Sequence, residues 1–292
     1  MQKQLQAKVK ETCVLHHFLK TEWHLSKKQI RQAKFRPNGI TVNGVQSRIN
    51  TLLQPGDIIS ITLEDADCGS HHLLPYEHPL SILYEDEDLL AVNKPAGMVV
   101  HPSHGHYCDS LANAVTSYYH QKGVSVTIRS VGRLDKDTSG IVVFAKNQVA
   151  AARLAAQRDN GQFQKEYLAL VASVPVPTFG TIRTNLCKDT TSLSKMKTAE
   201  HGMQAVTHYQ VIQSFQEYSA VSLHLETGRT HQIRVHMSSI GHPLLGDSLY
   251  GGSQKFIQRT ALHALRCRFD QTFSKKRIEL EAPIPQDMKT LM

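Results

Sequence analysis

The feature that most constrains the fold is a charged turn at residues 132–140, which lies between two short runs of β-branched and aromatic residues. These runs, residues 126–131 and 141–145, predict a strand on each side of the turn. Glycines at both ends of the turn allow tight bends and close backbone approach. A charged loop held by two buried strands is rigid and accessible to a ligand, so we expect it to carry chemistry. On its own, an Arg-x-Asp turn is more often a surface ion pair.

Hairpin-linked strands dominate the rest of the chain. Apolar, β-branched runs predict further strands at residues 81–84, 89–93, 164–173, 204–215, 218–226, 261–269 and 277–281. Three helices are expected among them, with Asp109, Asn147 and Thr230 as their N-caps. Many strands with few helices predict an α+β fold built on a large, mostly antiparallel mixed sheet with flanking helices.

The first 64 residues differ from the rest in charge. They carry ten Lys and Arg against four Asp and Glu, whereas the net charge of all 292 residues is +8. Two short helices are expected there, the second after an N-cap at Ser26, followed by strands near residues 40–44 and 58–63. The second helix should expose the cations Lys27, Lys28, Arg31 and Lys34. Such a face suits an RNA backbone, although a lone basic face is usually only solvated.

The composition of the chain predicts how it divides into domains and in which cellular compartment it works. Residues 65–79 lack periodicity and contain two prolines, so they predict a linker between a domain at 1–64 and a domain at 80–292. The five cysteines form no Cys-x-x-Cys pair, which argues against a disulfide framework and a zinc knuckle. No apolar run is long enough to cross a bilayer, and the first residues lack the apolar core of a signal peptide. We expect a cytoplasmic monomer that makes no membrane contact.

Three blocks in order carry a family resemblance. They are Arg133–Leu134–Asp135, then Glu166–Tyr167–Leu168–Ala169, then the run Thr-Gly-Arg-Thr-His-Gln-Ile-Arg-Val-His at residues 227–236. Together they resemble the RluA-type family of RNA pseudouridine synthases, from about residue 80 to the end. The N-terminal helix pair, with its Val-Asn-Gly and Pro-Gly-Asp turns, resembles the alpha-L RNA-binding motif of a small-subunit ribosomal protein.

The resemblance implies an enzyme that isomerises uridine to pseudouridine in structured RNA, with no metal and no organic cofactor. The alpha-L-like module favours ribosomal RNA over transfer RNA as the partner. Such a reaction needs an ionised carboxylate as nucleophile and a cation that keeps it ionised. The resemblance assigns these roles to Asp135 and Arg234, and it leaves open whether the sugar or the base is attacked. Tyr167 would be an active-site aromatic, either a base with a lowered pKa or a platform that stacks on uracil.

The remaining site residues also follow from the resemblance. Arg133 would fill the gap left by an everted nucleotide, Arg229 would contact phosphate, and Leu262 would form a pocket wall. Gly132 departs from the family pattern, because many relatives carry His there. Asp137 is the competing carboxylate, which we expect to stabilise the turn instead.

Three other functions compete with this interpretation. A His-x-x-His-x-His cluster at His101, His104 and His106 could indicate a metallohydrolase. An RNA-binding module with a decayed active site is a second alternative, which the joint presence of Asp135, Tyr167 and Arg234 disfavours. An N-glycoside hydrolase is the third, and it would release free uracil.

Overall fold

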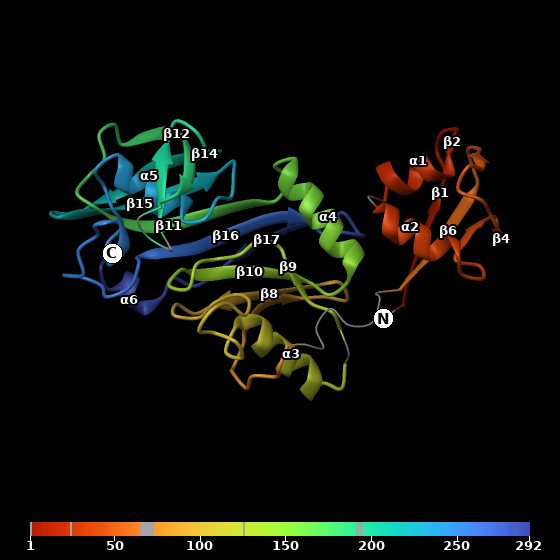
Figure 1. The fold of residues 1–292 in the computed structure, drawn as a ribbon, viewed down its shortest axis with the longest axis horizontal. Helices are drawn as coiled ribbons and strands as arrows, with labels where there is room; N and C mark the ends of the chain where they lie inside the picture. The colour runs from red at the N-terminus through yellow and green to blue at the C-terminus, as the bar shows by residue number, and fades with distance from the viewer. Residues whose placement is uncertain (1, 24, 65–72, 125, 191, 193–194) are drawn as a thin grey trace.

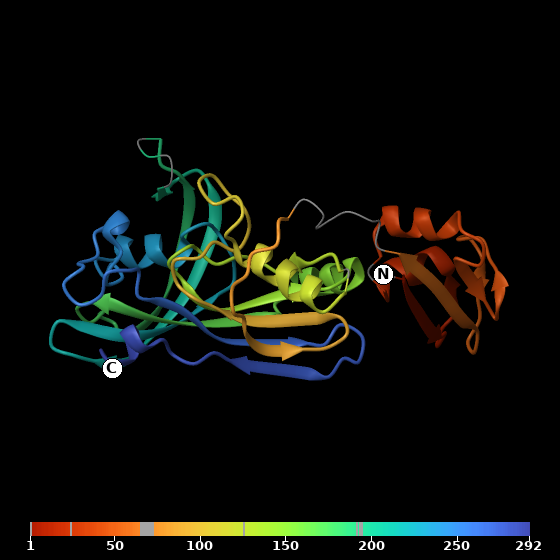
Figure 2. The ribbon, with the colours of Figure 1, turned by 90° about the horizontal axis from the view of Figure 1, so that it is seen from below.

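The computed structural model describes residues 2–23, 25–64, 73–124, 126–190, 192 and 195–292. A small N-terminal body and a large body built on one sheet follow each other along the long axis of the molecule (Figure 1). The view from below shows the same arrangement (Figure 2). Residues 65–72 of the predicted linker lie outside the described residues, so the division at 65–79 stays a prediction.

The N-terminal body contains a four-stranded sheet of order β1-β6-β3-β4, a two-stranded ladder β2-β5 and two helices. Its elements are β1 (Gln2–Lys8), β2 (Cys13–Val14), α1 (Leu15–Thr21), α2 (Lys27–Lys34), β3 (Ile40–Val42), β4 (Val45–Gln46), β5 (Leu52–Leu53) and β6 (Ile58–Glu64). Helix α2 begins where expected, because the Ser26 hydroxyl accepts the Gln29 N–H while the Gln29 side chain accepts the Ser26 N–H. Strand β1 was not predicted; it pairs with β6 over its whole length.

The large body is one eleven-stranded sheet. Its main order is β13-β12-β14-β15-β11-β16-β10-β8-β7, with β17 paired to β16 and β9 paired to β10. The strands are β7 (Ser81–Glu85), β8 (Leu89–Lys94), β9 (Arg129–Ser130), β10 (Ser139–Ala145), β11 (Gln164–Ala172), β12 (Phe179–Lys188), β13 (Met196–Ala199), β14 (Met203–Ser214), β15 (Tyr218–Leu225), β16 (Leu262–Asp270) and β17 (Arg277–Glu281). Only β10 and β16 pair in parallel among the described strands. The predicted α+β class with a mostly antiparallel mixed sheet is confirmed.

Strand β10 lies between β16 and β8 in this sheet, and every one of its residues is buried. It pairs with its parallel partner β16 at Ser139 and at Gly140, which has φ +110°. A Cβ atom at that position would lie 2.3 Å from the carbonyl oxygen of Ala264. Only glycine fits, because both the left-handed backbone and the close approach exclude a side chain. The glycine that ends the charged turn therefore sets the distance between these two strands.

The helices of the large body are short and lie against the sheet. They are α3 (Leu111–Gln121), α4 (Gln148–Asp159), α5 (Gln232–Ser239), the 3-10 turn η1 (Ser248–Tyr250) and α6 (Gln286–Lys289). Asn147 caps α4 as predicted, accepting the Ala150 N–H at 2.9 Å. The predicted cap of α3 was wrong by one residue: Ser110 is the N-cap, and Asp109 pairs with His106 at 2.7 Å instead. No helix in the described part of the chain is long and apolar enough to span a bilayer.

Helix α4 also contacts the N-terminal body, next to which it lies in Figure 1. The buried guanidinium of Arg153 donates to the carbonyl oxygens of Trp23, at 3.4 Å, and Thr272, at 2.8 Å. It also stacks over the ring of Phe273, with 4.6 Å from its carbon to the ring centroid. Val149 packs into the hydrophobic core of the N-terminal body. One helix thus provides contacts that fix the basic body relative to the large sheet.

Candidate active site

The register of three neighbouring strands brings the predicted site residues together. Strand β16 lies between β10 and β11, and it pairs Ser139 with His263 on one side and Ala169 with Leu262 on the other. Because β10 and β16 run in parallel, the loop that precedes β10 and the first residue of β16 lie at the same edge of the sheet. Asp135 lies in that loop, and Tyr167 is two residues along β11 from Ala169.

Asp135 and Arg234 lie side by side although 98 residues separate them in the chain. The distance from Arg234 Nη1 to Asp135 Oδ2 is 3.6 Å, and the side chains are 11% and 24% exposed. The carboxylate is therefore held beside a cation and still reaches solvent. Asp137, the competing carboxylate, is exposed, and among the described residues its one hydrogen bond runs from Arg259 Nη1 to its backbone carbonyl oxygen.

The stronger partner of Arg234 is Asp247, which the sequence analysis did not identify. Its two carboxylate oxygens accept from Nε at 2.6 Å and from Nη2 at 2.8 Å, and its side chain is 1% exposed. Burial opposes the charge on Arg234, but the hydrogen-bonded Asp247 carboxylate outweighs it and, with Asp135, raises the pKa of the guanidinium. A bidentate pair fixes the guanidinium plane. Asp247 thus aims the remaining nitrogen, Nη1, at Asp135.

The start of α5 differs from the prediction. Thr230 does not cap the helix; its hydroxyl accepts from Arg133 Nη2 at 2.8 Å. The N-cap is His231, which has φ +54° and makes no capping hydrogen bond with its side chain. Gln232 anchors the turn instead, since its amide oxygen accepts the Arg229 N–H at 3.0 Å and its amide nitrogen donates to the Val206 carbonyl at 3.0 Å. This buried glutamine ties the helix that carries Arg234 to β14.

Lys94 braces the loop that carries Asp135. This fully buried side chain donates from Nζ to the carbonyl oxygens of Pro95 at 2.8 Å, Met98 at 2.7 Å and Lys136 at 3.0 Å. Burial lowers the pKa of Lys94 to about 7, while the charges of Asp137 and Asp135 oppose that shift. Three carbonyl acceptors require three N–H donors, so the geometry holds this group as an ammonium ion. Its contact to Lys136 fixes the backbone next to Asp135.

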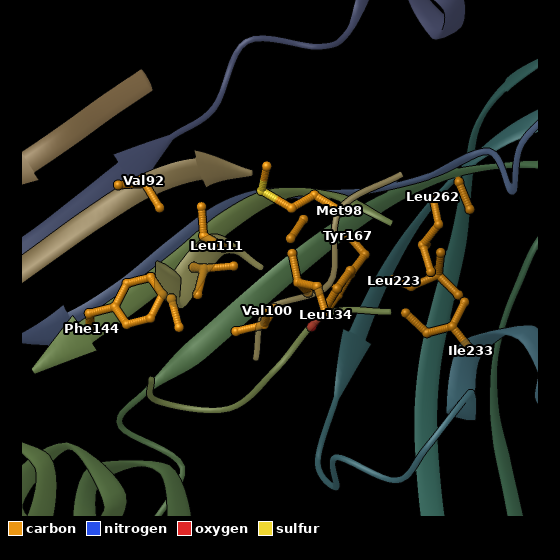
Figure 3. Close-up of a cluster of buried hydrophobic side chains, with 14 of the residues drawn as sticks. Val92, Met98, Val100, Leu111, Leu134, Phe144, Tyr167, Leu223, Ile233 and Leu262 are labelled. Atoms are coloured by element: carbon orange, nitrogen blue, oxygen red, sulfur yellow. The ribbon is translucent and has the colours of Figure 1, made fainter. Parts of the chain in front are cut away.

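An apolar wall lies beside the carboxylate. Tyr167 is 8% exposed and belongs to the main core cluster, together with Leu134, Leu223, Ile233 and Leu262. Figure 3 shows Tyr167 next to Leu134, with Leu262, Leu223 and Ile233 grouped on one side. Burial raises the pKa of the Tyr167 phenol, and the charges of Cys267 and Asp135 add to the effect. The phenol therefore stays protonated at neutral pH.

The residues predicted to bind RNA lie in two places. Arg133 is exposed next to Asp135, after Gly132, which has φ +79°. Arg229 is partly exposed, and its Nε donates to the Gln204 carbonyl at 3.1 Å. The four cations of α2 are all exposed on the N-terminal body, where Lys27, Lys28, Arg31 and Lys34 surround the 73%-exposed ring of Phe35.

The histidine cluster has other partners. His101 lies 2.7 Å from the Ser130 hydroxyl, and His106 lies 2.7 Å from Asp109. Within the described ranges, no group of three or more His, Cys, Asp or Glu side chains is arranged to hold a metal ion. The metallohydrolase alternative therefore has no support in the arrangement of these residues.

The arrangement can perform nucleophilic chemistry on a planar ligand. An accessible carboxylate lies beside a fixed guanidinium, and a buried aromatic residue with aliphatic neighbours forms the wall behind it. An apolar wall reduces the access of water to a reactive intermediate. The exposed arginine next to the carboxylate suits a polyanionic ligand.

Known proteins are similar to this chain in sequence and in fold. Residues 88–239 match a family described as RNA pseudouridylate synthase. The uncharacterized RNA pseudouridine synthase YjbO of Bacillus subtilis (strain 168) is 37% identical over 271 residues, which are 93% of this chain and 95% of the relative. The ribosomal large subunit pseudouridine synthase D of Zymomonas mobilis is 44% identical over 237 residues, which are 75% of this chain and 74% of the relative. The structure of human RNA pseudouridylate synthase domain containing 1 has a TM-score of 0.59 and 27% identity, with 70% of this chain and 83% of that one covered.

Proposed function

Because the chain belongs to the RNA pseudouridine synthase family, we propose that it isomerises uridine in ribosomal RNA through the carboxylate of Asp135. Two relatives support the choice of RNA, since the proteins from Zymomonas mobilis and Pseudomonas aeruginosa are named for the large ribosomal subunit and are 44% and 37% identical to this chain. The observation that carries the proposal is the 3.6 Å approach of Arg234 to Asp135.

The reaction sets out what the site must do. The bond between N1 of uracil and C1′ of ribose breaks, the base turns, and a new bond forms between C5 and C1′. C5 loses its proton and N1 gains one, so the product is an isomer of the substrate. No oxidant, reductant or group donor is needed, which supports a reaction without an organic cofactor. Asp135 forms a transient bond to the nucleotide and is released at the end.

Tyr167 supports the binding of the detached base. Because burial raises its pKa, the phenol is poorly suited to act as a base at neutral pH. Its ring can instead stack on uracil, and Leu262 and Ile233 form the apolar surface beside it. Such a wall keeps water from the ribose while the base turns, which favours isomerisation over hydrolysis.

Arg133 is placed to fill the gap left by an everted nucleotide. Its side chain is exposed, and its guanidinium is oriented by donating to the hydroxyl of Thr230, which lies just before α5. We expect Arg133→Ala to lower kcat/KM about 10- to 100-fold on structured RNA, because unpairing a base costs a few kcal/mol. Steady-state rates on an unpaired oligonucleotide with the same uridine are the control. On this RNA, Arg133→Ala should have the same kcat/KM as the unsubstituted protein. An equal loss on both RNAs would contradict the gap-filling role.

The exposed cations of α2 supply a second contact with the RNA backbone. The double change Lys28→Gln and Arg31→Gln should reduce the slope of log affinity against log salt by about 1.4, at about 0.7 per lost phosphate contact. Titration of a labelled ribosomal RNA fragment at several salt concentrations measures this slope. The matched control removes two exposed cations of the large body, Arg158→Gln and Lys289→Gln. If both double variants changed the slope equally, α2 would have no special role.

Mapping the product tests the proposed function itself. The purified chain is incubated with an unmodified transcript of large-subunit ribosomal RNA, and pseudouridines are then located by carbodiimide-dependent stops of reverse transcription. We expect stops at specific uridines and no free uracil in solution. Release of uracil would identify an N-glycoside hydrolase, and RNA binding with neither product would identify a binding module.

A further inference from the structure

His231 has a left-handed backbone conformation, which is uncommon for residues other than glycine. It lies immediately before α5 with φ +54°, in the left-handed region, and its side chain does not cap the helix. Strain of this kind persists where the surrounding structure enforces it, and it concentrates at functional sites. The consequence here is geometric, because the ring points back into the site with its side chain only 14% exposed.

Tyr250 fixes the orientation of the imidazole. The phenol oxygen lies 2.9 Å from His231 Nδ1 and accepts the backbone N–H of Met196 at 2.9 Å. Burial raises the pKa of Tyr250, so the phenol keeps its proton. Within the described residues that proton has no acceptor other than Nδ1. A neutral His231 then carries its own proton on Nε2.

Nε2 faces Asp135. It lies 3.9 Å from Oδ2, the same oxygen that Arg234 Nη1 approaches at 3.6 Å. No hydrogen bond reaches Oδ1 from any side chain in the described ranges. Burial lowers the pKa of His231, Arg234 adds to this shift, and the charge of Asp135 opposes it. The donors on one side of the carboxylate are thus a guanidinium and an uncharged N–H.

We propose that His231 is a positioning residue, whose Nε2–H holds one oxygen of Asp135 with Arg234 and leaves the other oxygen to attack the nucleotide. The proposal rests on the nucleophilic role of Asp135 in the proposed function. The 3.9 Å separation shortens to a hydrogen bond when the nucleotide fills the site, as catalytic contacts often do. An uncharged donor orients the carboxylate without adding a second full positive charge that would weaken it as a nucleophile.

Two substitutions separate this role from a purely structural one. His231→Gln places an amide N–H near the position of Nε2 and can still reach Asp135. His231→Asn reaches only to the position of Nδ1, so it keeps the contact with Tyr250 and loses the contact with Asp135. Asn tolerates left-handed backbone better than Gln does. A structural role therefore predicts that Asn is the better replacement, and the positioning role predicts that Gln is.

The kinetic test uses the full chain and an unmodified transcript of large-subunit ribosomal RNA. We expect His231→Asn to lower kcat about 10- to 100-fold with little change in KM, and His231→Gln to recover most of that loss. Equal activity of His231→Asn and the original protein would overturn the proposal, as would a higher kcat for Asn than for Gln. If the original protein produces no pseudouridine, the proposed function fails, and the contact is still tested as follows.

Nitrogen NMR of the histidine-labelled protein tests the contact without any turnover. The signals absent from His231→Asn identify His231, and we expect a neutral ring at pH 7 with its proton on Nε2. Asp135→Asn should lower the pKa of His231, because the negative charge that opposes the effect of burial is removed. A tautomer with the proton on Nδ1, or a pKa that Asp135→Asn leaves unchanged, would overturn the proposal.

Discussion

Asp135→Asn is expected to lower kcat by about 10⁴-fold or more, because the amide is nearly the same shape as the carboxylate and cannot act as the nucleophile. RNA affinity should be unchanged, since Asp135 contributes no positive charge to the RNA contact. Single-turnover formation of pseudouridine and a filter-binding titration on the same transcript measure the two quantities. The loss should appear in the rate alone.

Asp137→Asn is the matched control for this experiment. It makes the same chemical change two residues further along the same turn, at an exposed side chain. We expect it to retain activity, because within the described residues no hydrogen bond reaches the Asp137 carboxylate, whose charge acts on Lys94 without direct contact. If Asp137→Asn were the inactive variant and Asp135→Asn the active one, the nucleophile would be misassigned.

Arg234→Gln is expected to lower both stability and rate. It leaves the carboxylate of Asp247, 1% exposed, without its bidentate partner, and breaking a buried pair of this kind costs about 3–5 kcal/mol of unfolding free energy. The rate should fall by about 10²- to 10³-fold, since Asp135 loses the fixed cation beside it. Urea unfolding and single-turnover rates measure the two effects.

A double variant separates the two effects of Arg234. Arg234→Met combined with Asp247→Leu removes both buried charges, and replacing such a pair by apolar residues is often neutral for stability. We expect the double variant to have nearly the same urea midpoint of unfolding as the unsubstituted protein and to stay inactive. Recovery of activity together with stability would show that the guanidinium acts only through folding.

The N-terminal body illustrates how local signals predict some elements and miss others. Ser26 and Gln29 form a capping box within four residues, so the start of α2 can be predicted from sequence alone. Strand β1 has no such signal, because it forms through its pairing with β6, at least fifty residues away. Its sequence, Gln-Lys-Gln-Leu-Gln-Ala-Lys, is mostly polar and shows little strand propensity.

In the candidate active site too, some residues can be predicted from the sequence and others cannot. The motif blocks alone predicted Asp135, Tyr167 and Arg234 as site residues, and the structure places Arg234 Nη1 3.6 Å from Asp135 Oδ2. Their roles remain proposals until the variants above are measured. The motifs did not indicate Lys94 or Asp247, although each makes two or more hydrogen bonds that hold the site.

The family, the α+β class and the helix caps at Ser26 and Asn147 could be predicted from the sequence alone. The family follows from the resemblance of three motifs, and the class and the caps depend on period and on contacts within a few residues. The groups that surround the Asp135 carboxylate, by contrast, are brought together by folding. The bidentate contact of Asp247 depends on how the chain returns after α5, and the left-handed His231 depends on the anchoring of Gln232 to β14. Contacts across strands and loops are set by sheet order and register, which short sequence patterns do not encode.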